Sequence, residues 1–175
     1  MLEKMGEFFD ARLEGYEEHQ LTAIDNAQEF YPPHGSIFRK PHMQIREYTR
    51  YDPAQILPLY DSVGWTAYTK DPAALERGFA HSLLILAAYD QNRLIGILRA
   101  VGDGETVVLI QDLLIHPDHQ RKGIGSALMR TALDRFSHIR QVVLMADETK
   151  EAAAFYGTLG FQRMSDVDCC GFIRT

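Results

Sequence analysis

A glycine-rich turn separates a strongly apolar strand from an amphipathic helix in the second half of the chain. The strand spans Thr106–Ile115 and is rich in β-branched residues, and the turn, Gln120–Ser126, reads QRKGIGS. The helix then places its apolar residues on one face: Ile124, Leu128, Met129, Ala132, Leu133 and Phe136. A helix that begins in this way leaves its first N–H groups free, and its dipole favours a negative charge there. The pattern therefore predicts an anion-binding site at the turn.

The residues of the turn suit a phosphate group, although they do not form one of the common phosphate motifs. Gly123 and Gly125 let the main chain approach an anion closely, and Arg121 and Lys122 add positive charge at the rim. The turn has neither the GKS/T sequence of a Walker A loop nor the glycine spacing of a dinucleotide-binding turn. The glycines alone are explained equally well by a helix start that binds no ligand.

The rest of the chain also divides into predicted strands and helices. Helices are expected after Asp52-Pro53 and Asp71-Pro72, because Asp is a good N-cap and Pro fits the first helical position. Leu83–Tyr89 and Arg93–Val101 are expected to form a hairpin. Further predicted elements are strands over His42–Tyr48 and Gln141–Ala146, a helix from Lys150, and a final hairpin that pairs Phe161–Met164 with Cys169–Arg174.

Composition and charge exclude several classes of protein. The chain has 175 residues and a formal net charge of −6, so it lacks an overall basic footprint for nucleic acid. Its longest apolar runs, such as Leu83–Ala88, are too short to cross a membrane, and its N-terminus lacks the apolar core of a secretory signal. The adjacent Cys169 and Cys170 show no metal-ligand or disulfide pattern. We expect a reduced, cytoplasmic protein with no nucleic-acid or membrane partner.

A domain boundary is expected near residue 41. Residues 1–41 hold 8 acidic and 4 basic side chains, and the apolar residues from Leu2 to Leu13 fall on one helical stripe. Pro32-Pro33 and Pro41 then interrupt the chain. The sequence therefore predicts an N-terminal helical extension, 1–41, followed by a main domain, 42–175.

Two motifs in the main domain resemble the GCN5-related N-acetyltransferase (GNAT) superfamily. One is QRKGIG after the strand Thr106–Ile115, and the other is Phe155–Phe161, which reads FYGTLGF. The resemblance covers about residues 42–175 and rests on both motifs in this order. It implies an α/β (α+β) fold, with a mixed, mostly antiparallel sheet that is flanked by helices and whose fourth and fifth strands splay apart. Acetyl-CoA would enter the gap between those strands, Thr106–Ile115 and Gln141–Ala146.

The resemblance also implies which residues would bind acetyl-CoA. The backbone of Leu113, Leu114 and Ile115 would pair with the pantetheine arm like an added strand, and one of these N–H groups would polarise the thioester carbonyl. The pyrophosphate would lie on the amides of Arg121, Lys122, Gly123, Ile124, Gly125 and Ser126. Side chains around Ala153, Phe155 and Tyr156 would flank the arm on its other side.

Tyr156 and Asp112 are the candidates for proton transfer. Tyr156 matches the position of the superfamily's usual general acid, which would protonate the leaving thiolate; packing beside Phe155 is the alternative. Asp112 lies on the splayed strand and would accept a proton from the amine or bind the amine, but a surface or capping carboxylate explains it as well. Asp147 and Glu148 are further candidates at the end of the fifth strand, and many superfamily members use a chain of waters instead.

The acceptor amine is expected near the first two helices of the main domain. Trp65 and Tyr68 lie in a predicted loop there, where they would stack on an apolar or aromatic amine or seal the helix against the sheet. The net negative charge mildly favours a cationic amine. His116 and His119 lack the partners of a metal site, so no metal is expected.

Residues 8–31 weakly resemble the leader of class I SAM-dependent methyltransferases, through Phe8–Arg12, Gly15–His19 and Glu29–Tyr31. The strand and glycine-rich turn that SAM binding needs do not follow, so neither SAM binding nor methyl transfer is expected.

The predicted function is acetyl-CoA-dependent acetylation of a primary amine of a small molecule, with a homodimer as the assembly considered. The alternatives are an acetyltransferase for protein or peptide amines and a non-catalytic acyl-CoA-binding interaction module.

Overall fold

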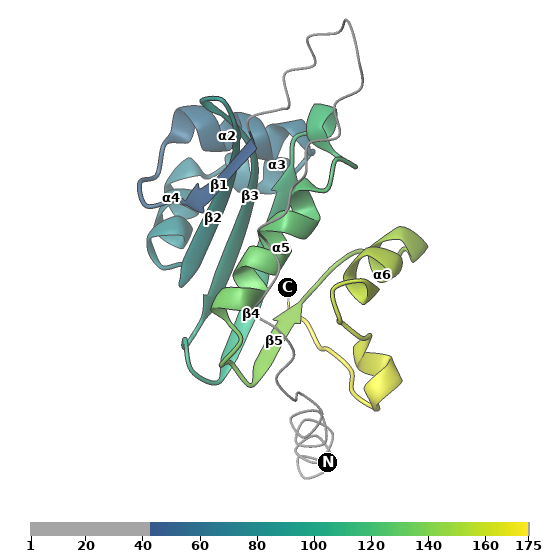
Figure 1. The fold of residues 1–175 in the computed structure, drawn as a ribbon. Helices are drawn as coiled ribbons and strands as arrows, with labels where there is room; N and C mark the ends of the chain where they lie inside the picture. Colours follow the sequence, from purple (N-terminus) through teal and green to yellow (C-terminus); the bar gives the residue numbers. More distant parts are fainter. Residues whose placement is uncertain (1–42, 175) are drawn as a thin grey trace, which may run out of the picture. The chain divides into compact units, whose positions relative to one another are not determined.

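Five strands form a single sheet in which each strand lies beside its neighbour in the chain (Figure 1). The structure is a computed structural model that describes residues 43–174, so the predicted extension, 1–41, lies outside the described residues. Strands β1 to β4 are antiparallel to their neighbours, whereas β5 is parallel to β4. The predicted mixed, mostly antiparallel sheet is therefore confirmed. The strands are β1 (Met43–Glu47), β2 (Leu84–Asp90), β3 (Arg93–Gly102), β4 (Val107–Ile115) and β5 (Gln141–Leu144).

Helices cover both faces of the sheet. Helices α2 (Pro53–Ser62), α3 (Thr66–Thr69) and α4 (Pro72–Ala80) lie over one face, and α5 (Ile124–Arg135) lies over the other (Figure 1). Both predicted N-caps are present, since the carboxylate of Asp52 accepts from the Ala54 N–H and that of Asp71 from the Ala74 N–H. None of the helices within residues 43–174 is long and apolar enough to cross a membrane.

The core is divided by the sheet into two layers. The layer beneath α5 joins Leu128 and Met129 of that helix to the buried side chains Leu86, Leu98 and Val108. The other layer joins Ile56 and Tyr60 of α2 and Phe79 of α4 to the opposite faces of the same strands. Helix α6 (Lys150–Gly157) follows β5 and packs Phe155 and Tyr156 against the α5 layer. The two layers hold β4 in place along most of its length.

A bulge in β4 reverses which side of the sheet its side chains face. Arg99 of β3 lies opposite Asp112, but the next residue, Ala100, lies opposite Ile110, so Gln111 is an extra residue. Before the bulge, Val108 and Ile110 pack in the α5 layer; after it, Leu114 packs in the α2 layer. The bulge therefore brings Asp112 to the face covered by α2.

The structure corrects two features expected from the sequence. Residues 161–174 contain no strand, so the predicted final hairpin is wrong; Met164–Val167 is a short 3₁₀ helix instead. The polar turn there closes on itself, because Cys169 donates its N–H to Met164 O and Asp168 takes a left-handed conformation. The predicted loop at Trp65 and Tyr68 is largely the single helical turn α3, which Trp65 begins.

Candidate active site

Strands β4 and β5 separate halfway along β4. Their parallel pairing begins at Val107 and Gln141 and ends at Ile110 and Leu144. Strand β4 continues to Ile115 without a strand partner on this side in the described part of the chain. Figure 1 shows the chain after β5 leading away from β4 into α6. The predicted splay of the fourth and fifth strands is therefore confirmed, and it leaves an open edge on β4.

The main-chain groups of Leu113 and Ile115 face this open edge. The His116 N–H donates to Ile95 O of β3 at 2.9 Å. Because main-chain direction alternates along an antiparallel strand, Leu114 also points its N–H and C=O toward β3, and Leu113 and Ile115 point theirs away. The Ile115 carbonyl accepts from the Gln120 side chain at 3.0 Å. Of the three predicted residues, Leu113 and Ile115 therefore have main-chain groups at the open edge. The main chain of Leu114 faces β3, and this residue is 2% exposed in the core.

The glycine turn leaves the first N–H groups of α5 without a side-chain partner. Gly123 is the N-cap residue, and no side chain of the described residues caps the helix there. Gly123 (φ +80°) and Arg121 (φ +56°) both take left-handed conformations, which turn the main chain sharply before the helix. The Lys122 ammonium group donates to Asp118 O at 2.6 Å, so it is held at the rim. Free N–H groups and nearby cations match the chemistry of a phosphate site.

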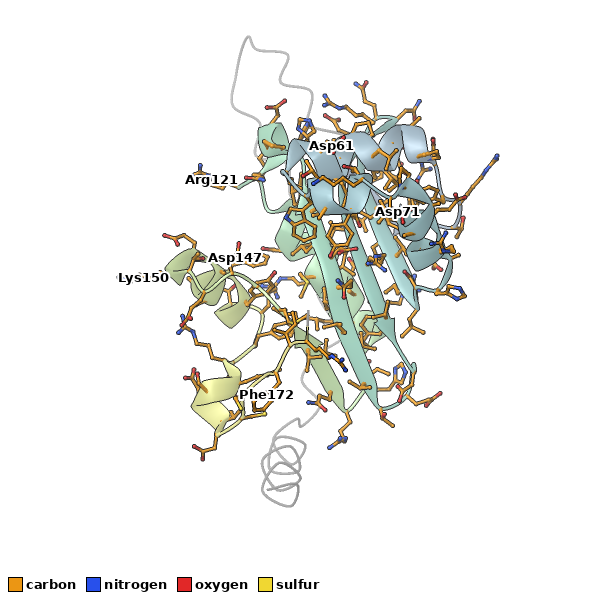
Figure 2. All side chains as sticks on the ribbon, turned by 180° about the vertical axis from the view of Figure 1, so that it is seen from behind. Asp61, Asp71, Arg121, Asp147, Lys150 and Phe172 are labelled. Carbon is orange, nitrogen blue, oxygen red and sulfur yellow. The ribbon has the colours of Figure 1, made fainter. Side chains whose placement is uncertain are left out.

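Gly125 lies where α5, β4 and α6 meet. A Cβ atom placed on Gly125 would lie 3.5 Å from Phe155 Cζ and 3.8 Å from Ile115 Cγ1. The predicted pyrophosphate residues, the open edge and the predicted flanking residue Phe155 are therefore neighbours in space. Figure 2 shows Arg121 on the same side of the domain as Asp147 and Lys150. Asp147 lies between β5 and α6, and Lys150 is the first residue of α6.

Tyr156 is half-buried on α6, beside two other aromatic rings. Its ring centroid lies 4.9 Å from that of Phe155 and 6.0 Å from that of Phe161, both in edge-on geometry. Burial raises the pKa of Tyr156 above its usual value, so the phenol stays protonated at neutral pH. A proton donor must hold its proton until the leaving group needs it, and Tyr156 meets that condition.

Asp112 is buried among charged and polar partners that no local sequence pattern predicts. Its Oδ2 accepts from Tyr60 Oη at 2.7 Å and from Arg99 Nε at 2.5 Å, and the residue is 1% exposed. Its Oδ1 is buried and has no hydrogen-bond partner among residues 43–174. Burial is the largest single effect on Arg99 and would lower its pKa, but the charges and hydrogen bonds of Asp112 and Tyr60 together raise the pKa. In the structure, the Asp112 carboxylate forms an ion pair with Arg99. Proton acceptance by Asp112 stays a prediction.

Tyr68 contacts the bulge of β4, and Trp65 packs on Tyr68. Their rings stack with centroids 5.7 Å apart, and Trp65 is 36% exposed. The Gln111 amide donates to Tyr68 Oη at 3.4 Å, and the Tyr60 ring lies 5.5 Å from that of Tyr68. The two predicted acceptor residues thus lie on the α2 side of the same segment of β4 whose edge is open.

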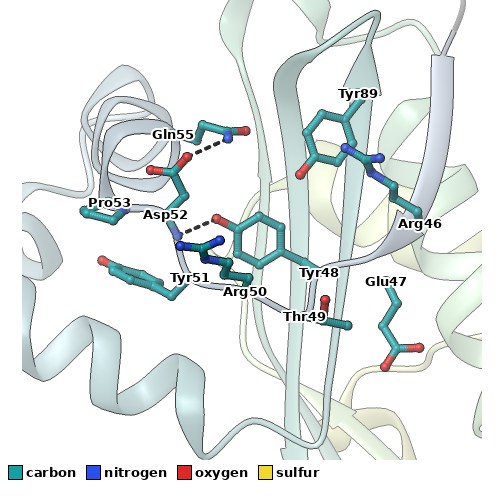
Figure 3. Close-up of a pocket in the computed structure, with 10 residues that line it drawn as sticks. All are labelled: Arg46, Glu47, Tyr48, Thr49, Arg50, Tyr51, Asp52, Pro53, Gln55 and Tyr89. Carbon is teal, nitrogen blue, oxygen red and sulfur yellow. Dashed lines mark hydrogen bonds between the residues drawn. The ribbon is translucent and has the colours of Figure 1, made fainter.

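Two further features of the described residues are a histidine next to the end of β4 and a cavity. His116 Nε2 accepts a hydrogen bond from the Arg93 guanidinium group at 2.9 Å, and the described residues contain no group of three His, Cys, Asp or Glu side chains that would hold a metal. A cavity of about 770 Å³ lies at the β1 edge of the sheet, lined by Arg46, Arg50, Tyr48 and Tyr89 among others (Figure 3). It contains none of the predicted site residues.

A family model and a solved structure, both described as acetyltransferases, match this chain. The acetyltransferase (GNAT) domain family matches residues 81–163, which run from the end of α4 to just beyond α6. A solved GNAT family acetyltransferase from Streptococcus pneumoniae TIGR4 is 39% identical, with a TM-score of 0.70, over 76% of this chain and 97% of that one. The chain belongs to the GNAT acetyltransferase family. The predicted superfamily and fold are thereby confirmed.

Two curated relatives extend the comparison of this GNAT domain. The uncharacterized N-acetyltransferase ycf52 of Gracilaria tenuistipitata var. liui is 36% identical over 59% of this chain. The histone acetyltransferase TAP1 of Glycine max is 35% identical, also over 59% of this chain. The match spans 58% and 49% of the lengths of these relatives, so it concerns the domain that they share.

Proposed function

We propose that this GNAT domain transfers the acetyl group of acetyl-CoA to a primary amine of a small molecule. The observation that carries the proposal is the open edge of β4 beside the uncapped start of α5. An extended amide chain fits the edge by strand-like pairing, and a pyrophosphate fits the free N–H groups of the helix. Family membership supports the same reaction.

Each group at the site has a role that follows from its position. The N–H groups of Ile124, Gly125 and Ser126 would hold the pyrophosphate, with Arg121 and Lys122 at the rim. The N–H groups of Leu113 and Ile115 face the open edge, where a fixed donor polarises a carbonyl and stabilises the charge that develops on its oxygen. Acetyl-CoA supplies the acetyl group as an activated thioester. The Tyr156 hydroxyl is the proton donor for the departing thiolate sulfur, and Ala153 and Phe155 flank the same gap.

The acceptor would bind on the α2 side, against Trp65 and Tyr68. Their stacked rings offer a flat apolar surface, and Gln111 connects that surface to the edge where the thioester would lie. A protein lysine is a second candidate acceptor, because the soybean relative is named a histone acetyltransferase. The two candidates differ in size and in what surrounds the amine, so they can be separated by assay.

The proposal is tested by calorimetry and a thiol-release assay. Acetyl-CoA should bind the purified chain, and SAM should not. A panel of small primary amines and a panel of lysine-containing histone-tail peptides should then be compared for release of free coenzyme A thiol. Turnover of small amines supports the first candidate, and turnover of the peptides alone supports the second. Tight acetyl-CoA binding with no turnover in either panel would favour a non-catalytic acyl-CoA-binding module, and absence of acetyl-CoA binding would contradict the proposal.

A further inference from the structure

The buried ion pair lies directly beside the bulge that opens β4. Arg99 and Asp112 are the last paired residues before the register shifts, and their side chains bond to each other across β3 and β4. The extra residue of the bulge, Gln111, immediately precedes Asp112. A bulge bends the strand that carries it. A contact that holds the bulge therefore also fixes the direction of the β4 residues that follow it.

The residues that follow are those of the open edge. Leu113 and Ile115 face the gap only because their main-chain register is offset from that of Val108 and Ile110 by the extra residue. A one-residue change of register would turn the outward N–H groups toward β3. The position of the bulge therefore decides which N–H groups are free at the edge.

Tyr60 ties this point to helix α2. It is fully buried, and its hydroxyl donates to the same Asp112 oxygen, Oδ2, that accepts from Arg99. The guanidinium group of Arg99 also lies 3.4 Å from Gly78 O and from Ser82 Oγ, at the end of α4. The carboxylate is thus held directly from β3 and from α2, and Arg99 links it to the end of α4. Such a shared, water-excluded network fixes side-chain positions more firmly than a single bond does.

We propose that Tyr60, Asp112 and Arg99 are positioning residues that hold the Gln111 bulge, so that the free N–H groups of β4 point at the thioester carbonyl. The inference rests on the proposed function, because it assigns a purpose to the open edge. It also gives Asp112 a role through the main chain in place of direct proton acceptance. None of the three side chains needs to touch either substrate.

Tyr60→Phe is the variant that tests this role. It keeps the ring against Phe79 and removes the hydroxyl that donates to Asp112. Tyr48→Phe is the matched control: Tyr48 is also buried and packs on Phe79, but its hydroxyl accepts from the Asp52 N–H and does not contact Asp112. Both variants lose one buried tyrosine hydroxyl, so a loss of stability alone should affect them similarly.

Three readouts separate positioning from stability: the dissociation constant for acetyl-CoA, kcat, and the infrared stretching frequency of the carbonyl of bound, carbon-13-labelled acetyl-CoA. A donor aimed at the carbonyl lowers that frequency relative to solution. Tyr60→Phe should bind acetyl-CoA within about threefold of the native affinity, lose much of the frequency shift, and lose roughly tenfold in kcat. Tyr48→Phe should retain both the shift and kcat.

The outcomes are distinguishable from those of the proposed function. If the native chain does not bind acetyl-CoA, the proposed function fails. If it binds and Tyr60→Phe keeps the full frequency shift and kcat, the positioning role is overturned and the network only stabilises the fold. Arg99→Lys is a second variant, which keeps the positive charge but changes its geometry; it should also reduce the shift, and an unchanged shift would count against the proposal.

Discussion

The ring of Phe155 on α6 lies over Gly125 at the start of α5, so that a Cβ atom on Gly125 would be 3.5 Å from Phe155 Cζ. A methyl group fits at that distance, but a larger side chain must enter the gap in which the pantetheine arm is proposed to lie. Gly125→Leu should therefore weaken acetyl-CoA binding at least about tenfold, whereas Gly125→Ala should weaken it only slightly. Titration calorimetry on both variants checks this, with circular dichroism to confirm that each is folded. Equal affinities for Gly125→Leu and the native chain would place the ligand elsewhere.

Tyr156→Phe should separate chemistry from binding. The variant keeps the ring that packs against Phe155 and Phe161 and removes only the proposed proton donor. General acid catalysis is typically worth about 10²–10⁴ in rate, so kcat should fall by at least about tenfold while the dissociation constant for acetyl-CoA stays within about twofold. Steady-state kinetics and calorimetry measure the two quantities. An unchanged kcat would leave Tyr156 with a packing role.

The pH dependence of kcat tests the same residue in another way. Because burial raises the pKa of Tyr156, the phenol loses its proton only at a pH above its ordinary value of about 10. A proton donor fails once it is deprotonated, so Tyr156 should cause no fall in kcat between about pH 7 and pH 9. A kcat profile over this range provides the check. A fall within it that disappears in Tyr156→Phe would contradict the raised pKa.

Asp112→Asn should be far more destabilising than the loss of a surface ion pair. Removal of the carboxylate charge leaves the Arg99 guanidinium buried without a counter-charge, which costs roughly 3–5 kcal/mol in the free energy of unfolding. Arg135→Gln removes an exposed pair with Glu47, whose atoms are 3.5 Å apart, and should cost about 1 kcal/mol or less. Urea denaturation compares them. Similar losses in the two variants would show that Asp112 and Arg99 contribute no more than an ordinary surface pair.

The parts of the site that could be predicted depend on residues that are close together in the chain. A strand, a glycine turn and a helix predict the uncapped start of α5, and Asp-Pro pairs predict where α2 and α4 begin. The bulge at Gln111 carries no such signal, because it depends on how β3 and β4 pair. Arg99 is a partial exception, since a charged residue within the apolar strand Leu94–Val101 indicates a buried partner.

Long-range contacts explain most of what the sequence did not predict. The partners Tyr60 and Asp112 are 52 residues apart, and no local pattern connects them. The sequence predicts a final hairpin that pairs Phe161–Met164 with Cys169–Arg174, yet the residues between them form a short 3₁₀ helix and a turn that closes on Met164. Pairing in a sheet depends on a partner edge as well as on strand propensity. Propensity alone therefore could not decide between a hairpin and the observed turn.

Hydrogen exchange at three consecutive amides tests the binding of acetyl-CoA along β4 most directly. Leu114 donates toward β3, so its amide should exchange slowly with or without ligand, whereas the amides of Leu113 and Ile115 face the open edge and should exchange quickly in the free protein. Nuclear magnetic resonance should show that saturating acetyl-CoA protects Leu113, Ile115 or both, and leaves Leu114 unchanged. Binding of acetyl-CoA with no new protection at either edge residue would contradict the proposed site.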